Sequence, residues 1–317
     1  MKTRSKARAV AVPSYDEEFL DEESPGTWTL AWRRLRRNRA AVAGGIVVIL
    51  FYLIAIFSSV IAPYDPNKVH FANIMTPPMW MQGGTPAFIF GTDELGRDEL
   101  SRLIYGSRIS MTIGLIPVVF YLTIGGFFGL LAGYAGGAAD NVIMRVVDIF
   151  YALPDLLIII MLVTFLRETP AANILSGMGI LFFALALFGW VGIARLVRGQ
   201  VLVFKETPFV EAARALGSSP SRIIMKHIVP HVLAPVIVSL AFTIPGAIIL
   251  EATLSFIGIG IRPPTPSWGN MVQEGFGAML TQPYMAMLPA GCIAIVTLAF
   301  TFFGDGLRDA LDPRMRL

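Results

Sequence analysis

Apolar runs of about twenty residues recur along this chain of 317 residues, and few charged side chains interrupt them. A helix of that length crosses the hydrocarbon core of a bilayer, where backbone polar groups must hydrogen-bond within the segment itself. Charged residues make up only 15% of the chain, well below the roughly one quarter of soluble domains. The sequence therefore predicts an all-α polytopic membrane protein with six transmembrane helices, at residues 40–62, 111–134, 149–165, 178–193, 232–257 and 284–303.

Lys and Arg side chains are distributed unevenly among the expected loops. The two short loops expected outside, residues 166–177 and 258–283, hold only Arg167 and Arg262. The outer segment after the first span is less clear, since it contains Lys68, Arg97, Arg102 and Arg108 together with the acidic residues Asp65, Asp93, Glu94, Asp98 and Glu99. The segments before the first span and between the fourth and fifth spans are basic, with Arg33, Arg34, Arg36, Arg37, Arg39, Arg195, Arg198, Lys205, Arg214, Arg222 and Lys226. Because basic loops stay in the cytoplasm, we expect both termini and the loop between spans four and five to be cytoplasmic.

Composition divides the chain into four segments. Residues 1–31, basic and then acidic, are expected to form a disordered cytoplasmic tail. Residues 32–110 should contain an interfacial helix, the first transmembrane helix and an extracytoplasmic segment, and residues 111–304 a transport domain. Residues 305–317 would form a cytoplasmic C-terminal tail. A nucleic-acid patch is the rival interpretation of the arginines before the first span, but their position next to a span disfavours it.

A polar, basic loop at residues 207–230 separates two apolar runs, and its residues are consistent with two short helices. The first would span Pro208–Leu216, with Thr207 as its cap and Gly217 ending it just after Leu216. The second would start near Pro220 and stop near Pro230. On these signals alone, the first helix fits either an amphipathic element on the membrane surface or a docking site for another protein.

The same loop resembles the EAA loop of ABC importer permeases. Matches to the family's motif stand at Glu211, Ala212, Ala213, Gly217 and Pro230, whereas His227 and Val229 depart from it. The resemblance implies a coupling helix that docks on a separate ATPase subunit. Its coupling residues would be Glu211, Ala212, Ala213, Arg214, Leu216 and Gly217.

Three further segments, residues 91–110, 255–271 and 304–316, resemble permeases of the dipeptide, oligopeptide and nickel importer family, C-type subunit. The resemblance implies the ABC type I importer permease fold in the cell membrane. It also implies a homologous second permease, two ATPase subunits that bind ATP and Mg, and an extracytoplasmic substrate-binding protein. The cargo would be a peptide or a similar small solute. Within these segments, Trp268 is expected at the membrane interface.

Two acidic residues lie inside expected spans, where charge is costly and often functional. Asp155 follows Pro154 in the third span, and Glu251 lies near the outer end of the fifth. Each could line the pathway or act in gating, or could instead make an interhelical hydrogen bond. The second span carries glycines at four-residue intervals, which predicts close helix packing without naming the partner: Gly125, Gly129, Gly133 and Gly137.

The chain contains no phosphate-binding loop, zinc-protease motif or nucleophile elbow. We therefore expect no catalytic residue, no metal and no cofactor bound by this chain itself. The alternative from another class is a secondary transporter, driven by an ion gradient through Asp155 or Glu251, with a broken helix at Pro245. Such a transporter needs no ATPase partner, so the energy source discriminates between the two hypotheses.

Overall fold

The computed structural model describes residues 27–170 and 177–312, and within these ranges the chain is helical and forms no β-sheet. The expected all-α class is confirmed. The α-helices are α1 (Thr27–Arg37), α2 (Arg39–Ile56), α3 (Ser58–Ile61), α4 (Glu99–Phe120), α5 (Gly126–Ala135), α6 (Gly137–Ala152), α7 (Asp155–Arg167), α8 (Met178–Phe204), α9 (Pro208–Ala215), α10 (Pro220–Ile223), α11 (Val229–Phe256), α12 (Trp268–Phe276) and α13 (Tyr284–Leu311). The described residues also form a short 3₁₀ turn, η2 (Phe71–Asn73), and two π-helical turns, η3 (Tyr121–Gly125) and η5 (Ile224–Ile228).

Five helical stretches of the described chain are long and apolar enough to cross a membrane: Arg39–Ile56, Glu99–Ala135, Met178–Phe204, Pro220–Phe256 and Tyr284–Leu311. The bent pair α6–α7 makes a sixth if it counts as one broken span. Most of the helices run beyond the ends expected from hydropathy, because polar residues continue the helix outside the apolar stretch. Thus α4 begins at Glu99, well before the expected start at residue 111.

The expected third span, residues 149–165, is not one straight helix. Helix α6 ends at Ala152 and α7 begins at Asp155, with an angle of 83° between them. Leu153 is extended, with φ −84° and ψ 139°, as expected of a residue that precedes proline. Pro154 therefore breaks this segment rather than bending it gently.

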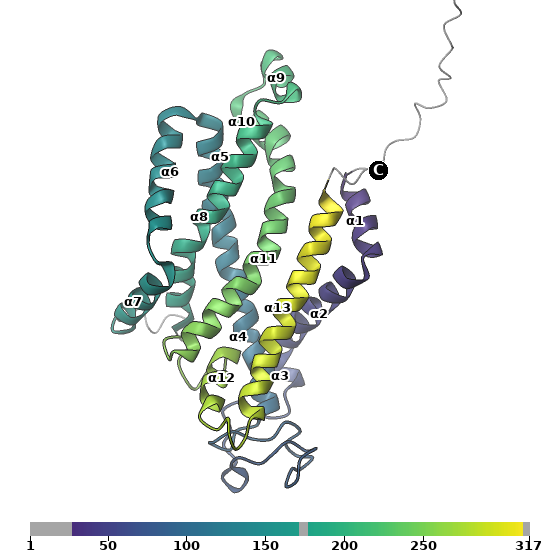
Figure 1. The fold of residues 1–317 in the computed structure, drawn as a ribbon, viewed down its shortest axis with the longest axis vertical. Helices are drawn as coiled ribbons and strands as arrows, with labels where there is room; N and C mark the ends of the chain where they lie inside the picture. Colours follow the sequence, from purple (N-terminus) through teal and green to yellow (C-terminus); the bar gives the residue numbers. More distant parts are fainter. Residues whose placement is uncertain (1–26, 171–176, 313–317) are drawn as a thin grey trace, which may run out of the picture.

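The long helices form a bundle in which neighbours in space are not always neighbours in sequence (Figure 1). Helix α13 packs along both α2 and α11, and α5 packs along α8. Helix α9 lies at one end of the molecule and α12 near the opposite end (Figure 1). The largest cluster of buried apolar side chains joins α4, α7, α8 and α11, and it also includes residues of α9.

The glycines spaced four residues apart, Gly125, Gly129 and Gly133, form a ladder that packs against α8. The sequence predicted close packing here but did not identify the partner helix. A Cβ added at Gly129 would lie 2.6 Å from the carbonyl oxygen of Ala194, and one at Gly133 would lie 2.7 Å from Cβ of Val201. No larger residue fits at either position without moving the α8 backbone or side chains. Gly137 does not continue the ladder, since it has φ +55° at the turn into α6 and open space around it.

Both described ends of the chain lie near the end of the bundle that carries α9 (Figure 1). Ala31 and Leu35 of α1 are buried against α13, and Arg34 donates a hydrogen bond to the carbonyl oxygen of Asp312 at 3.2 Å. Helix α1 begins at Thr27, before the expected boundary at residue 32, and α13 runs to Leu311, past the boundary at residue 305. Of the disordered tail expected at residues 1–31, residues 27–31 are instead helical and belong to α1, whereas residues 1–26 lie outside the described residues.

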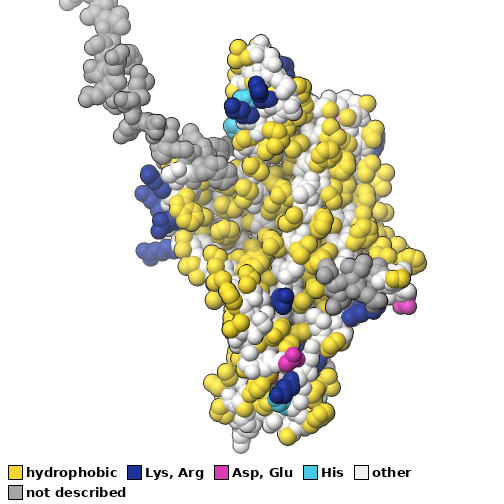
Figure 2. Space-filling view, turned by 180° about the vertical axis from the view of Figure 1, so that it is seen from behind, with side chains coloured by type: hydrophobic (Ala, Val, Ile, Leu, Met, Phe, Trp, Pro, Cys, Tyr) yellow, Lys and Arg dark blue, Asp and Glu magenta, His cyan; other side chains and the backbone are white. Residues whose placement is uncertain are grey.

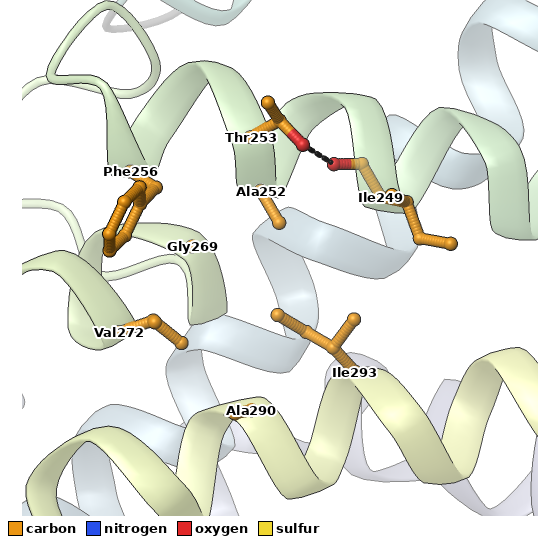
Figure 3. A pocket seen from close by; sticks show the side chains of 8 residues that line it. All are labelled: Ile249, Ala252, Thr253, Phe256, Gly269, Val272, Ala290 and Ile293. Carbon is orange, nitrogen blue, oxygen red and sulfur yellow. Dashed lines mark hydrogen bonds between the residues drawn. The ribbon is translucent and has the colours of Figure 1, made fainter.

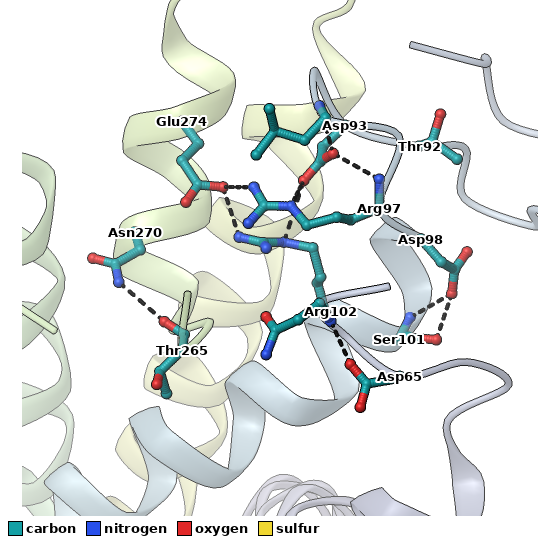
Figure 4. A network of polar contacts seen from close by, with 12 residues as sticks. Asp65, Thr92, Asp93, Arg97, Asp98, Ser101, Arg102, Thr265, Asn270 and Glu274 are labelled. Atoms are coloured by element: carbon teal, nitrogen blue, oxygen red, sulfur yellow. Dashed lines mark hydrogen bonds and ion pairs between the residues drawn. The ribbon is translucent and has the colours of Figure 1, made fainter. Parts of the chain in front are cut away.

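At the opposite end, a network of ion pairs fastens α12 to the start of α4 (Figure 4). Arg97 donates to Asp93 at 2.6 Å and to Glu274 of α12 at 2.9 Å, and Arg102 donates to the same Glu274 at 2.6 Å. Asp98 caps α4 by accepting from the backbone N–H of Ser101 at 2.8 Å, and burial raises the pKa of its carboxyl.

Trp268, expected at the membrane interface, is instead fully buried at the start of α12. Its indole Nε1–H donates to the carbonyl oxygen of Leu103 in α4 at 3.1 Å. The ring also meets Phe51 of α2 edge-on, with 5.5 Å between the centroids. The prediction that Trp268 lies at the membrane interface was wrong. The buried carbonyl oxygen of Leu103 accepts from the indole N–H, so this group does not need the lipid headgroup region as a hydrogen-bond partner.

Candidate functional site

Helix α9 is a short element that extends from the bundle while its inner face is anchored in it. Val210 is fully buried and Ala213 is 8% exposed, and both belong to the cluster that includes Ile223 and Ile228. The helix spans Pro208–Ala215, one residue short of the expected end. Apolar contacts on one side therefore fix α9 to the start of the following helix.

The C-terminal end of α9 is a Schellman turn built around Gly217. The N–H of Gly217 donates to the carbonyl oxygen of Arg214, and that of Ser218 to the carbonyl oxygen of Ala213, both at 3.0 Å. Gly217 has φ +79°, a conformation that glycine adopts at low cost. The prediction that Gly217 ends this helix is confirmed.

The N-terminal end of α9 differs in detail from the expectation. Thr207 occupies the N-cap position, but its hydroxyl donates back to the carbonyl oxygen of Phe204 and makes no capping hydrogen bond. An aromatic contact fixes this end instead, because the His231 ring stacks on Phe209 at 5.1 Å and meets Phe204 at 5.2 Å. The sequence did not indicate this contact, because His231 lies more than twenty residues after Phe204 and Phe209 in the chain.

The expected end of the second short helix near Pro230 is wrong. The chain remains helical from Pro220 to Phe256. The π-helical turn η5 precedes Pro230, and within it the N–H of Val229 donates to the carbonyl oxygen of Ile224, five residues earlier. The π turn widens the helix where proline, lacking an N–H, would otherwise clash with the preceding turn. The loop thus contains one short helix and the beginning of a long one.

The outward face of α9 carries small, charged and apolar side chains together. Glu211, Ala212 and Arg214 are exposed, and Leu216 is 87% exposed. Alanines allow another protein to approach the helix backbone, and an exposed leucine favours a partner with an apolar groove. Lys and Arg side chains also gather around this end of the molecule (Figure 2). Of the expected coupling residues, only Ala213 faces inward.

Asp155 lies at the first position of α7, on the exposed side of the break after α6. Its Oδ1 accepts from the backbone N–H of Leu156 at 2.7 Å. A carboxylate at a helix N-terminus is favourable because it accepts from free N–H groups.

Glu251 is fully buried and joins three helices. The hydroxyl of Ser255, in the same helix, donates to its carboxylate at 2.6 Å, and that of Ser267 at the start of α12 donates at 2.8 Å. Ser110 of α4 donates at 3.5 Å. Sequence reasoning had no signal for the two distant serines. The alternative of an interhelical hydrogen bond is therefore realised in the structure.

On the other side of α11 lies an open, apolar hollow of about 270 Å³ between α11, α12 and α13 (Figure 3). Its lining consists of Ile249, Ala252, Thr253, Phe256, Gly269, Val272, Ala290 and Ile293. The Thr253 hydroxyl donates to the carbonyl oxygen of Ile249 at 2.8 Å. Within the described residues, no group of three His, Cys, Asp or Glu side chains is placed to hold a metal ion.

Comparison with known proteins identifies two family models along the chain. The model described as binding-protein-dependent transport system inner membrane component matches residues 125–317. The model of the N-terminal TM domain of oligopeptide transport permease C matches residues 26–78.

Individual relatives are similar over nearly their whole length. The oligopeptide transport system permease protein OppC of Bacillus subtilis is 38% identical over 301 residues, covering 95% of this chain and 94% of OppC. The glutathione transport system permease protein GsiD of Pectobacterium atrosepticum is 38% identical over 313 residues, covering 99% and 98%. The dipeptide transport system permease protein DppC of Haemophilus influenzae is 39% identical over 285 residues, covering 90% and 94%.

A solved structure of the inward-facing MetNI methionine ABC transporter has a similar fold. Its matching chain is 19% identical, with a TM-score of 0.50, and the match covers 67% of this chain and 96% of that one. The likeness supports the expected ABC importer permease fold. None of these similarities supports the alternative of a secondary transporter.

Proposed function

Since the chain belongs to the family of binding-protein-dependent transport system inner membrane components, we propose that it forms half of a peptide pathway through the membrane. The chain is a permease subunit of an ABC importer. Its relatives include permeases named for oligopeptide, dipeptide and glutathione transport. A peptide or a similar small solute is therefore the class of cargo that we assign to it.

The observation that carries this proposal is the construction of α9. A helix anchored by Val210 and Ala213, ended by a Schellman turn at Gly217, and exposing Glu211 and Leu216 is suited to transmit force between two proteins. We assign the docking of an ATPase subunit to this face. ATP and Mg would bind to the two ATPase subunits, and this chain would supply contacts and no catalytic residue.

We assign the remaining partners to the two ends of the bundle. The end with α9 would face the cytoplasm together with both termini. The opposite end, with α12 and the ion pairs around Arg97 and Glu274, would face an extracytoplasmic substrate-binding protein. A homologous second permease would complete the pathway. In this arrangement Glu251 would tie α12 to α11 as part of the outer gate, because its carboxylate holds serines from both elements.

Cross-linking tests the docking assignment directly. With the native Cys292 changed to Ser, a cysteine is placed at Leu216, which is 87% exposed, and a matched cysteine at Thr265 near the opposite end. We expect the Leu216→Cys variant to form cross-links with the ATPase subunits in membranes and the Thr265→Cys variant to form none. Cross-linking to the substrate-binding protein from position 216 would refute the assignment.

A further inference from the structure

Helix α6 buries only one narrow strip of its surface and leaves two exposed stripes with different chemistry. Residues that share a face of a helix recur at intervals of three and four. One exposed stripe is apolar, with Val142, Val146 and Ile149. The other carries Arg145 and Asp148 and continues toward Tyr151. The apolar stripe of α6 is suited to contact lipid, and the polar stripe is suited to contact water or polar groups.

Helix α8 continues the polar side of α6. Arg195 donates to Asp148 at 2.5 Å, and its guanidinium lies 3.9 Å from the centroid of the Tyr151 ring. Gly192 and Gly199 stand three residues before and four residues after Arg195, and a Cβ at either position would meet nothing within 4 Å. We call these residues the polar wall: Arg145, Asp148 and Tyr151 of α6, with Gly192, Arg195 and Gly199 of α8.

The polar wall lies within helices that are candidate membrane spans, since α8 qualifies by itself and α6 qualifies together with α7. Arg195, expected in the loop after residue 193, thus belongs to α8. Asp148 stands roughly 16 Å along α6 from its start at Gly137, and Arg195 roughly 13 Å along α8 from its end at Phe204, at 1.5 Å per residue. Although they form an ion pair, the side chains of Arg195 and Asp148 are 42% and 54% exposed. A carboxylate on a short side chain cannot reach the headgroups from that depth, so exposure to lipid would be costly. Such groups in membranes face a water-filled space or another protein.

We propose that the polar wall lines the aqueous translocation pathway and that Arg195 and Asp148 bind the charged ends of a zwitterionic substrate. The substrate carboxylate would pair with the Arg195 guanidinium, which offers several donors in a fixed geometry. The substrate ammonium would pair with Asp148. This inference rests on the proposed function, and it adds the site within the membrane that recognises the termini of a peptide.

The two glycines of the polar wall differ from the glycines that pack one helix of this chain on another. Close helix contacts in membranes place glycines against a backbone, as Gly129 does against Ala194. Gly192 and Gly199 instead border open space between charged side chains. A protein partner seated on this wall would bury Asp148 and Arg195 and exclude water from both glycines.

Thiol labelling distinguishes these arrangements. Inside-out vesicles hold the complete transporter with the Cys292→Ser background and a single cysteine at Gly192, Gly199 or Ile149. We expect a charged methanethiosulfonate reagent to modify the Gly192→Cys and Gly199→Cys variants at least about tenfold faster than the Ile149→Cys variant, which lies on the apolar stripe at the depth of Asp148. Equal rates, or protection of both glycine positions in a transporting complex, would overturn the proposal.

Charge exchange tests the ligand role against a purely structural one. We expect Asp148→Asn and Arg195→Gln each to reduce ATP-dependent uptake of dialanine by about tenfold or more, as for loss of a charged hydrogen bond. Where the wild-type complex prefers glutathione, glutathione is the probe. The double exchange Asp148→Arg with Arg195→Asp should keep the ion pair but should not restore uptake. In this variant the substrate carboxylate would meet a negative charge at position 195 and the substrate ammonium would meet a positive charge at position 148 in the bound orientation.

The matched control is the other ion pair between the same helices, Asp140 with Arg198, which is less exposed at 15% and 33%. Its double exchange should restore the uptake that either single change removes. Restoration by the exchange at positions 148 and 195 would refute the ligand role. If wild-type vesicles show no ATP-dependent uptake, the proposed function as an ABC importer is refuted. The labelling rates do not depend on that result and test only whether the polar wall faces water.

Discussion

The most direct test of the coupling role is the substitution of Gly217 by valine. The change acts on the backbone, because a Cβ at this position would meet nothing within 4 Å. With φ +79°, a residue with a Cβ is held in a left-handed conformation, which costs roughly 1–2 kcal/mol. A β-branched side chain lies at the upper end of that range. The substitution therefore perturbs the turn without disturbing any packed contact.

The size of the effect follows from what holds the turn. If valine keeps the turn, α9 bears this strain of about 1–2 kcal/mol. If valine opens the turn, the hydrogen bonds from Gly217 and Ser218 to the preceding carbonyls are lost, at about 1 kcal/mol each. Both routes lower the population of the docking-competent helix by roughly tenfold, since 1.4 kcal/mol corresponds to a factor of ten.

The assay is quantitative co-purification of the ATPase subunits with each variant, together with uptake in cells. We expect Gly217→Val to insert at wild-type levels and to lose about nine tenths of its ATPase at limiting ATPase concentration. Gly217→Asn should retain most of it, because asparagine tolerates the left-handed conformation. Gly217→Ala should fall between the two.

A matched control separates backbone strain from the side chain itself. Gly126 also has open space around it, but its φ is −60°, the ordinary helical value. Gly126→Val should therefore leave ATPase binding unchanged. If Gly217→Val retains wild-type docking and uptake, α9 is not the coupling element and the central reasoning fails.

Three further results are expected. A cysteine at Ser218 should be labelled only from the cytoplasmic side and one at Thr265 only from outside; labelling of both from one side would contradict the topology. Asp155→Asn should change stability by less than about 1 kcal/mol, since the Asp155 carboxylate accepts a hydrogen bond from the start of its own helix. Uptake by the wild-type protein should require ATP and should persist when the proton gradient is dissipated. Uptake that stops when the proton gradient is dissipated would favour the secondary-transporter hypothesis over the ABC importer. Glu251→Ala should destabilise the bundle by about 1–3 kcal/mol, because buried serine hydroxyls lose their acceptor; an unchanged thermal midpoint in detergent would count against that role.

Local features of this fold could be predicted from the sequence because their causes are local. Hydropathy located the spans, and the position of Gly217 after an alanine-rich helix predicted the turn that the structure contains. The spacing of Gly125, Gly129 and Gly133 predicted close packing, although only the structure identifies α8 as the partner.

Features that depend on distant residues could not be predicted. Pro230 looked like a helix end because the π turn that accommodates it leaves no mark in the sequence. Trp268 suited an interface until Leu103, far away in the chain, supplied a buried acceptor. Glu251 likewise gave no hint of its partners, since Ser110 and Ser267 lie in other helices.

The unbroken helix from Pro220 to Phe256 fixes a phase relationship between the two ends of the molecule. Its 37 residues span roughly 55 Å at 1.5 Å per residue. Each residue turns a helix by about 100°, so inserting one residue between His231 and Glu251 would rotate the carboxylate away from Ser110 and Ser267 while His231 still stacked on Phe209. The angular register between His231 and Glu251 therefore restricts which insertions and deletions this segment can tolerate. A single-residue deletion there should be more harmful than a larger one of a whole number of turns.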